Sequence, residues 1–375
     1  MIGRSAFMVI GVVAARANVS YDFSALRHYL DSTASFYGNL SMTVGDASGV
    51  LFEYSNVDMH PDVVLQLASG SKWPGVTALM GCFAANNISI DTKLSKYLDW
   101  WTTNASDSRS NVTIRQVLSM TTGMITDPGG DGVFAEIANL SVAAFEDCDL
   151  EGGNTAQCAR AMYEALPSQV VPVYLPGTKF LYTTLGFQWT AAVAEVVEGR
   201  PIGDILNAYV LDKAGMSPDC SWSNQDVNPL IGAGLECSAR KLDKFVHGML
   251  VDGIVSTKTR LEMETVQLTE PSMYGSASLY WGAYCLGNWL ECLNNYRLKR
   301  LMPSQCFRAD RHGYWNFVSR TQGYYFNMLP SYTCNSTNNY CDSPLGDANC
   351  PALYGWAQTV RTAAAMYLDD IFDVY

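Results

Sequence analysis

The chain has 375 residues, of which 48% are hydrophobic and 16% are charged, so it is long enough for a large core and for two or three domains. Its 36 acidic residues outnumber its 24 basic residues, which gives a formal net charge of −12. Because no run of basic residues accompanies this balance, the composition argues against binding to nucleic acid or to an anionic membrane.

The first 17 residues have the pattern of a secretory signal peptide. Arg4 precedes an apolar run over residues 6–15, and Ala15-Arg16-Ala17 has the A-x-A form of a cleavage site. The run is too short to span a bilayer, and no later stretch is long and apolar enough to do so. The mature protein, residues 18–375, is therefore predicted to be secreted or to reside in the lumen of the secretory pathway.

Glycosylation motifs and cysteines agree with export. N-x-S/T motifs start at seven asparagines, of which the first would be the mature N-terminus and is discounted: Asn18, Asn39, Asn87, Asn104, Asn111, Asn139 and Asn335. Of the 11 cysteines, Cys82 lies in an apolar segment and is predicted to be a buried free thiol. The other ten are available for disulfides whose connectivity a sequence does not reveal: Cys148, Cys158, Cys220, Cys237, Cys285, Cys292, Cys306, Cys334, Cys341 and Cys350.

The residue types that hold metals are not arranged for that purpose. No C-x-x-C motif occurs, and the four histidines are scattered along the chain: His28, His60, His247 and His312. We therefore predict neither a metal site nor a cofactor.

The mature chain begins with a predicted helix and an antiparallel hairpin. Residues 21–30 have the apolar spacing of a helix. Residues 40–44 alternate apolar and polar side chains, residues 45–49 have the composition of a turn, and residues 50–54 resume as a strand.

Roughly from residue 75 to residue 225 the pattern is mostly helical. The helices are expected at residues 76–85, 113–120, 159–166, 187–198 and 202–211. One interruption is predicted, because residues 127–153 are rich in Gly and Asp and indicate an insertion or a long surface loop. A further helix is predicted at 239–250.

The last quarter of the chain changes character. Aromatic, strand-like segments occur at 280–290, 314–318 and 323–329, and a polar loop with cysteines follows at 334–350. An amphipathic helix at 356–372 closes the chain. This order predicts an α+β fold with one antiparallel sheet built from both chain ends, flanking terminal helices and an inserted helical lobe, because βαβ units are absent.

One short motif suggests chemistry. Ser69 lies in a turn of small residues, and Lys72 follows at the start of an apolar helix. If the first turn is already helical at Ser69, both side chains lie on the same face, and the hydroxyl and amine have the arrangement of an activated nucleophile. The alternative is that Ser69 or Ser71 caps the helix and that Lys72 is solvated.

Five blocks in order resemble the serine β-lactamase-related family, which includes class C β-lactamases, penicillin-binding DD-peptidases and esterases of the family VIII type. The block that contains Tyr182, PGTKFLYTTLG, is similar to the family's P-G-T-x-F-x-Y-S-N-x-G. The blocks span most of the mature chain, at Leu67–Lys72, Ile90–Leu98, Val112–Gly123, Pro176–Gly186 and Gly232–Leu242.

The resemblance implies a role for each matching residue. Ser69 would be the acylated nucleophile, and Lys72 would deprotonate it or hold its proton network. Tyr182 would be a general base or acid, which requires positive charge nearby because an ordinary phenol has a pKa far above neutral. The alternative for Tyr182 is a core aromatic residue.

Two departures from the family pattern concern substrate binding. Thr184 stands where the family usually has Asn, which favours esters over β-lactams or peptides because Thr lacks the carboxamide. The third family motif, K-T-G or H-x-G, corresponds either to Arg311-His312-Gly313 or to Arg308-Ala309-Asp310. In the second alignment, an acidic side chain would oppose an oxyanion.

The leading prediction is a secreted serine hydrolase that forms an acyl-enzyme at Ser69. Its expected substrates are small carboxyl esters, followed by amides, including β-lactams. Thr184, Arg311, His312 and Gly313 would contact the substrate. The alternative is a catalytically inactive relative with a binding or structural role. The sequence does not indicate the oligomeric state.

Overall fold

The computed structural model describes residues 20–37, 39–56, 59–126, 133–267, 283–292, 309–312, 316–331, 334–335, 340–341 and 363–372. The predicted signal peptide lies outside these ranges. Within them, no helix has the length and apolar character needed to cross a membrane.

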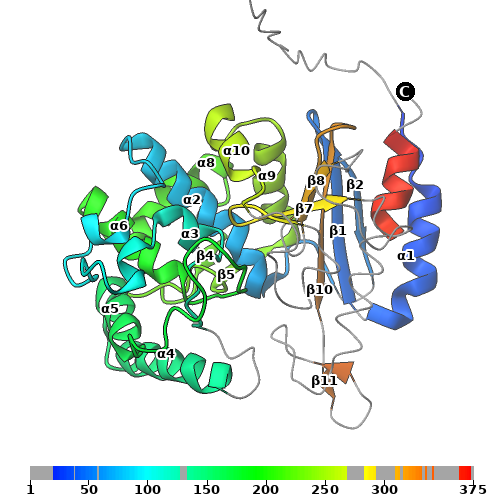
Figure 1. Ribbon diagram of the computed structural model, residues 1–375. Coiled ribbons are helices and arrows are strands. Elements are labelled where there is room, and N and C mark those ends of the chain that lie inside the picture. The colour runs from blue at the N-terminus through cyan, green and yellow to red at the C-terminus, as the bar shows by residue number, and fades with distance from the viewer. Residues whose placement is uncertain are drawn as a thin grey trace, which may run out of the picture.

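Seven antiparallel strands from the two ends of the chain form the main sheet (Figure 1). Their order is β2-β1-β10-β9-β8-β7-β6, and β1 pairs with β10 from Asn39 opposite Ser331 to Asp46 opposite Tyr324. The prediction of one sheet built from both chain ends is confirmed. The strands are β1 Asn39–Asp46, β2 Gly49–Ser55, β6 Ala283–Tyr284, β7 Trp289–Cys292, β8 Ala309–His312, β9 Asn316–Ser319 and β10 Tyr324–Ser331.

Alternate side chains of β1 pack against two different layers, as the period of a strand requires. Leu40, Met42 and Val44 belong to an apolar cluster with α1 (Ser24–Tyr37) and with the helix at residues 363–372. Figure 1 shows these two terminal helices side by side on the outer face of the sheet. On the opposite face, Asn327 Nδ2 donates to Thr43 Oγ1 and to the carbonyl oxygen of Ala239, where α9 (Ala239–Leu250) begins.

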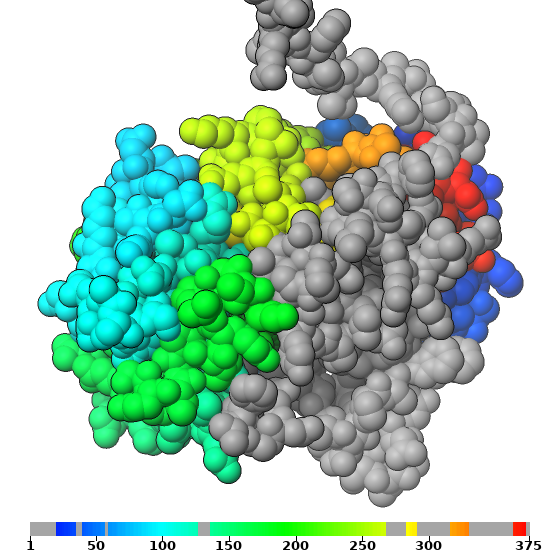
Figure 2. Space-filling view, in the orientation of Figure 1, coloured from blue at the N-terminus to red at the C-terminus, as the bar shows by residue number. Residues whose placement is uncertain are grey.

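The helical lobe is inserted between the two sets of strands, as predicted. The helix at 187–198 has the bounds expected from the sequence, and a π-helical turn, Asn207–Leu211, joins α7 to α8. In the space-filling view, the cyan and green lobe lies beside the yellow-green segment that carries α9 and α10 (Figure 2). The helices of the lobe are α2 Lys72–Ala85, α3 Ile114–Leu118, α4 Val133–Leu150, α5 Thr155–Ala165, α6 Phe187–Glu198, α7 Ile202–Leu206 and α8 Asp212–Ala214.

The predicted surface loop at 127–153 is wrong over most of its length. Its glycines and aspartates lie near the two ends of the segment, whereas Ile137, Ala138 and Phe145 are buried at helical spacing within α4. Apolar periodicity therefore outweighs composition here. Near the end of α4, a disulfide joins Cys148 to Cys158.

Several short elements were not predicted. A small antiparallel sheet has the order β3-β5-β4 and carries the chain toward Ser69. The segment expected to be a polar loop near 334–350 contains the paired strands β11 and β12. The additional elements are β3 Val64–Gln66, β4 Ser221–Trp222, β5 Leu235–Ser238, α10 Thr257–Met263, β11 Cys334–Asn335 and β12 Tyr340–Cys341.

The structure contains a second disulfide, between Cys220 and Cys237. Cys82 is buried and forms no disulfide, as the sequence predicts. Burial raises the pKa of its thiol to about 12, and the nearby Glu198 carboxylate contributes to the shift. A thiol with so high a pKa is a poor nucleophile at neutral pH.

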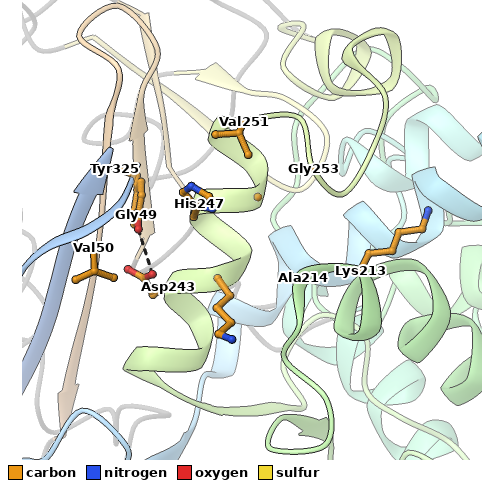
Figure 3. A pocket seen from close by; sticks show the side chains of 11 residues that line it. Gly49, Val50, Lys213, Ala214, Asp243, His247, Val251, Gly253 and Tyr325 are labelled. Atoms are coloured by element: carbon orange, nitrogen blue, oxygen red, sulfur yellow. Dashed lines mark hydrogen bonds between the residues drawn. The ribbon is translucent and has the colours of Figure 1, made fainter. Parts of the chain in front are cut away.

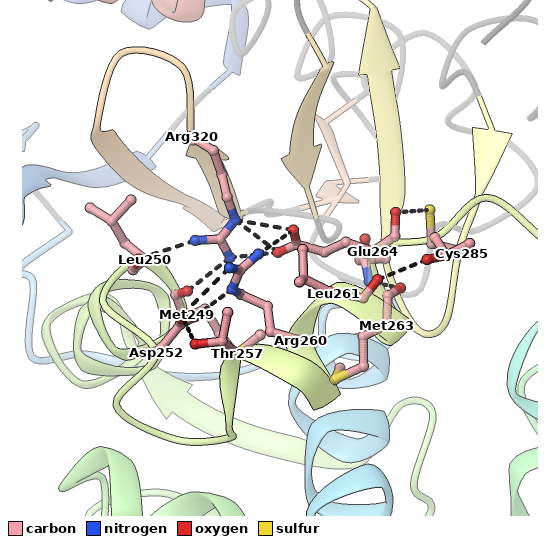
Figure 4. Close-up of polar contacts among 12 residues, drawn as sticks. Met249, Leu250, Asp252, Thr257, Arg260, Leu261, Met263, Glu264, Cys285 and Arg320 are labelled. Atoms are coloured by element: carbon pink, nitrogen blue, oxygen red, sulfur yellow. Dashed lines mark hydrogen bonds and ion pairs between the residues drawn. The ribbon is translucent and has the colours of Figure 1, made fainter. Parts of the chain in front are cut away.

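A buried ion-pair network joins α10 to the sheet (Figure 4). Glu264, whose side chain is 6% exposed, accepts from Arg320 at 2.5 Å and from Arg260 at 2.9 Å. Arg320 also donates to the carbonyl oxygens of Met249 and Leu250, at the C-terminus of α9. The Glu264 carboxylate therefore joins α10, through Arg260, to the turn after β9, through Arg320. Arg320 extends the network to the end of α9.

Candidate active site

Ser69 lies at the junction between the small sheet and the central helix of the lobe. Strand β3 leads into a 3₁₀ turn, Ala68–Ser71, and α2 continues from Lys72. Neither capping interpretation is found: no side chain caps α2, and Ser71 Oγ accepts instead from the backbone N–H of Leu235 at 2.9 Å. Ser71 is therefore structural, and Ser69 remains as the candidate nucleophile.

The side chain of Lys72 is not solvated but 3% exposed, and three acceptors surround its amine. Its Nζ atom lies 3.0 Å from Ser69 Oγ, 3.0 Å from Thr184 Oγ1 and 3.1 Å from the carbonyl oxygen of Gly232. A neutral amine has two N–H donors and one lone pair, so this site lets it donate to Thr184 and Gly232 while it accepts the proton of Ser69. The arrangement suits a general base.

Tyr182 contacts the amine of Lys72 with the face of its aromatic ring and not through a hydrogen bond from its hydroxyl. Nζ of Lys72 is 4.7 Å from the ring centroid, which is the geometry of a cation–π contact. Tyr182 is 37% exposed, which excludes the alternative of a core aromatic residue. A proton-transfer role for its hydroxyl stays a prediction.

The segment Pro176–Gly186, which ends just before α6, brings Thr184 into contact with Lys72. Phe180 anchors this segment to the sheet, because its ring packs 5.2 Å from Tyr284 and 5.5 Å from Trp289, on β6 and β7. Burial raises the pKa of Tyr284 well above its ordinary value, and the proximity of Tyr182 adds to the shift. Strands β6 and β7, at the edge of the main sheet, therefore lie next to the segment Pro176–Gly186.

The turn between β6 and β7 packs directly on the nucleophile helix. Gly287 has φ +74°, and a Cβ atom at this position would stand 2.6 Å from Cβ of Val76 and 3.0 Å from the carbonyl oxygen of Lys72. Only glycine allows this approach. The contact fixes the sheet edge relative to α2.

Both candidate third motifs fall at or next to strand β8. Arg311 and His312 lie on it, opposite Leu290 and Trp289 of β7, and Gly313 is outside the described residues. In the first alignment, the motif residue His312 is opposite Trp289 of β7, and the ring of Trp289 packs on Phe180. In the second alignment, Ala309 and Asp310 start the same strand. A substrate contact by any of these residues stays a prediction.

The carbonyl of Gly232 is a part of the site that sequence reasoning missed. Its block, Gly232–Leu242, was recognised by resemblance, but a backbone acceptor leaves no side-chain signal. The close fit explains the glycine: a Cβ atom here would stand 2.9 Å from the carbonyl oxygen of Thr184.

Ala68, immediately before the nucleophile, has φ +44°, a left-handed conformation that costs an L-residue roughly 1–2 kcal/mol. Glycine avoids this strain but loses more chain entropy on folding, by roughly 0.5–1 kcal/mol. We therefore expect Ala68→Gly to raise the free energy of unfolding by about 0.5–1 kcal/mol in urea titrations. Ala192→Gly, in the middle of α6, serves as the control and should lower it by about 1 kcal/mol. Equal losses in both variants would contradict strain at Ala68.

A pocket of about 380 Å³ is lined by residues of α8, α9, the β1–β2 turn and β10 (Figure 3). Ser69 is not among its lining residues. Asp243 and His247 of α9 line it together with Val50 and Tyr325. The Tyr325 hydroxyl donates to Asp243 Oδ2 at 3.1 Å. Burial raises the pKa of the Asp243 carboxyl above its ordinary value of 3.8.

This raised pKa gives a stability prediction with a definite sign. The folded state binds the proton of Asp243 more tightly than the unfolded chain does, so its contribution is fully present below pH 3.8 and is lost as the pH rises through the folded-state pKa. Asp243→Asn should therefore be more stable than the wild type near neutral pH, with a gap that narrows as the pH approaches 3.8. Urea unfolding at both ends of this range measures the gap, and a gap independent of pH would contradict the prediction.

Comparisons with known proteins show the family of the chain and proteins with a similar fold. The family model for Beta-lactamase matches residues 38–276. No curated protein matches the sequence.

Solved structures with a similar fold include a beta-lactamase, a hydrolase with acyltransferase activity and an amidase. A beta-lactamase from Mycobacterium bovis is 16% identical with a TM-score of 0.58, and the match covers 92% of this chain and 99% of that one. EstCE1, a hydrolase with promiscuous acyltransferase activity, is 15% identical with a TM-score of 0.63 and coverage of 91% and 97%. The D-amino acid amidase from Ochrobactrum anthropi SV3 is 13% identical with a TM-score of 0.63 and coverage of 92% and 98%. Likenesses at this level show a shared fold.

Proposed function

The chain belongs to the beta-lactamase family, and from this premise we propose that it is a secreted serine hydrolase that forms an acyl-enzyme at Ser69, with carboxyl esters as its preferred substrates. The observation that carries the proposal is the 3.0 Å contact between Ser69 Oγ and Lys72 Nζ, in a site where two other acceptors occupy the remaining hydrogen-bond positions of the amine.

The reaction follows from this arrangement. In this role Lys72 reacts through an unprotonated amine: it takes the Ser69 proton as Oγ attacks the ester carbonyl, and the tetrahedral oxyanion accepts from the backbone N–H of Ser69 and from one on β8. The intermediate collapses by breaking the C–O bond, and Lys72 returns the proton to the leaving alkoxide. Water then attacks the acyl-enzyme with Lys72 as its base, which releases the carboxylic acid and restores Ser69. Tyr182 would support these transfers from above the amine.

Esters are favoured over amides by Thr184. Its hydroxyl accepts from Lys72, and it has no carboxamide to bind a substrate amide. The amine leaving group of an amide is poorer and needs more assistance than an alcohol.

Export is supported by the surface positions of the glycosylation motifs. Four motif asparagines are exposed on the lobe: Asn87, Asn104, Asn111 and Asn139. At Asn104, which is exposed, Ser106 donates to Oδ1 through its backbone N–H at 3.0 Å and its hydroxyl at 2.8 Å, so neither bond uses the amide nitrogen to which a glycan would be attached. The two disulfides are compatible with an oxidising compartment.

A fluorophosphonate probe tests the proposal, because it labels only activated serines. We expect the wild type to be labelled and Ser69→Ala to remain unlabelled, with Ser71→Ala as a matched hydroxyl control that retains labelling. Equal labelling of wild type and Ser69→Ala would overturn the assignment of the nucleophile. An unlabelled wild type that hydrolyses short p-nitrophenyl esters no faster than Ser69→Ala would instead favour the inactive binding protein.

A further inference from the structure

We propose that Gln188 is a positioning residue for the acylation reaction, because it holds the loop whose carbonyl group accepts from Lys72. This inference rests on the proposed function of Ser69 and Lys72. Gln188 contacts neither of them; it acts through the loop Asn228–Gly232.

Gln188 makes three hydrogen bonds to this one loop. Its side chain is fully buried in the first turn of α6. Its Nε2 atom donates to Asn228 Oδ1 at 3.1 Å and to the carbonyl oxygen of Pro229 at 3.0 Å, and its Oε1 atom accepts from the N–H of Ile231 at 3.0 Å. The carboxamide thus uses both ends to fix three positions of a segment that has no helix or strand of its own.

The same loop ends at the amine. Gly232 directly follows Ile231, and its carbonyl oxygen lies 3.1 Å from Lys72 Nζ. The loop has little room to move toward α6, because a Cβ atom at Gly232 would stand 3.0 Å from the Phe187 ring, one residue before Gln188. A loop shift away from α6 would separate the carbonyl from Lys72.

A further layer of contacts supports Gln188. Asp149, at the end of α4, accepts from Nδ2 of Asn228 at 2.9 Å and from Nδ2 of Asn224 at 2.8 Å. With its Nδ2 held by Asp149, Asn228 presents Oδ1 to Gln188. The orientation of both amide groups is therefore set by a carboxylate, which is a pure acceptor.

The chemical consequence concerns the lone pair of Lys72. Donation to Gly232 and Thr184 directs the remaining position of a neutral amine toward Ser69 Oγ. Without a fixed Gly232 carbonyl, the amine rotates among its partners, and a fraction of the enzyme points an N–H at the nucleophile. Misplacement of a catalytic group by about 1 Å can cost about 10²-fold in rate.

Gln188→Met and Gln188→Glu test the proposal with p-nitrophenyl butyrate as substrate. Methionine keeps the volume without the hydrogen bonds, and we expect kcat/KM to fall by about 10- to 100-fold, through kcat rather than KM. A protonated glutamic acid can still donate to Pro229, whereas its carboxylate would face acceptors. The kcat/KM of Gln188→Glu, divided by the wild-type kcat/KM at the same pH, should therefore rise as the pH is lowered. The same quotient for Gln188→Met should not change with pH.

Gln225→Met is the matched control. Gln225 also braces this region, by accepting from Trp222 N at 2.9 Å and donating to Asn207 Oδ1 at 2.8 Å, but it does not bond the segment that ends at Gly232. It should lose thermal stability and keep its kcat. If Gln188→Met does not fold, Gly232→Ala displaces the same carbonyl and should lower kcat similarly.

The outcomes separate the two proposals. If Ser69→Ala is inactive while the Gln188 variants keep the wild-type kcat and show no pH-dependent ratio, the positioning role is overturned and the proposed function stands. If Ser69→Ala retains the wild-type rate, both are overturned. A kcat loss in Gln188→Met equal to that in Gln225→Met also overturns the positioning role, because a general loss of stability then explains it.

Discussion

Replacement of Lys72 by methionine is expected to lower kcat/KM for p-nitrophenyl esters by about 10³- to 10⁴-fold, while the fold is retained. Methionine fills nearly the same volume but neither takes up a proton nor donates to Thr184 and Gly232. The loss should be in kcat, because the hydrogen bonds of Lys72 are made to Ser69, Thr184 and Gly232, which set up the chemical step. Steady-state kinetics combined with circular dichroism measure both parts of this expectation.

Lys96→Met is the matched control for this loss. Lys96 also has its amine over an aromatic ring, at 5.5 Å from the centroid of Tyr97. Unlike Lys72, it is exposed to solvent. Its replacement should leave kcat/KM unchanged. A similar rate for Lys72→Met and wild type would rule out the amine as the base.

Tyr182→Phe separates the ring from the hydroxyl. The ring contact with Lys72 survives this change, so a loss of about 10²-fold or more would assign proton transfer to the phenol. Retained activity would leave Lys72 as the sole base and would limit Tyr182 to the packing of its ring against the amine.

Replacement of Glu264 by glutamine is expected to lower the free energy of unfolding by about 3–5 kcal/mol. Glu264 is the acceptor for two guanidinium groups, those of Arg260 and Arg320, and it is 6% exposed. Glutamine leaves part of their positive charge uncompensated in a poorly solvated region. Urea unfolding monitored by tryptophan fluorescence measures the loss.

The chain offers a control with the same geometry at the surface. Arg160 and Glu164 form the same i,i+4 pair as Arg260 and Glu264, but both side chains are 55% exposed. Glu164→Gln should change stability by less than about 1 kcal/mol, because water screens exposed pairs. A comparable effect in both variants would mean that burial does not determine the strength of the Glu264 network.

Much of the fold was predictable because long elements carry periodic patterns. The bounds of α6 and α9 agree with the apolar spacing of residues 187–198 and 239–250. The small sheet β3-β5-β4 was missed because its strands have two to four residues, too few for a period of two to be recognised. The helix α4 was missed because glycine and aspartate near its ends dominated the composition of the segment.

In the candidate site, the residues with a recognisable side-chain motif could be predicted from the sequence, whereas the backbone groups could not. The proximity of Ser69 and Lys72 was predictable because their spacing puts them one turn apart, but only the resemblance of five ordered blocks pointed to Ser69 rather than a capping role. Tyr182 and Thr184 were found through the same resemblance. The carbonyl of Gly232 and the loop that Gln188 holds were not, because backbone acceptors and the partners of a buried amide depend on tertiary contacts alone.

The pairing of β1 with β10 has a consequence for the order in which the protein is made. Thr43 and Asn327, which share a hydrogen bond across this pair, are 284 positions apart. During translation, the N-terminal hairpin leaves the ribosome long before the strands that complete its sheet, whereas the inserted lobe meets its own partners sooner. The central strand pair therefore forms late and with a high contact order, which favours slow folding and exposes an unpaired edge of β1 while synthesis continues.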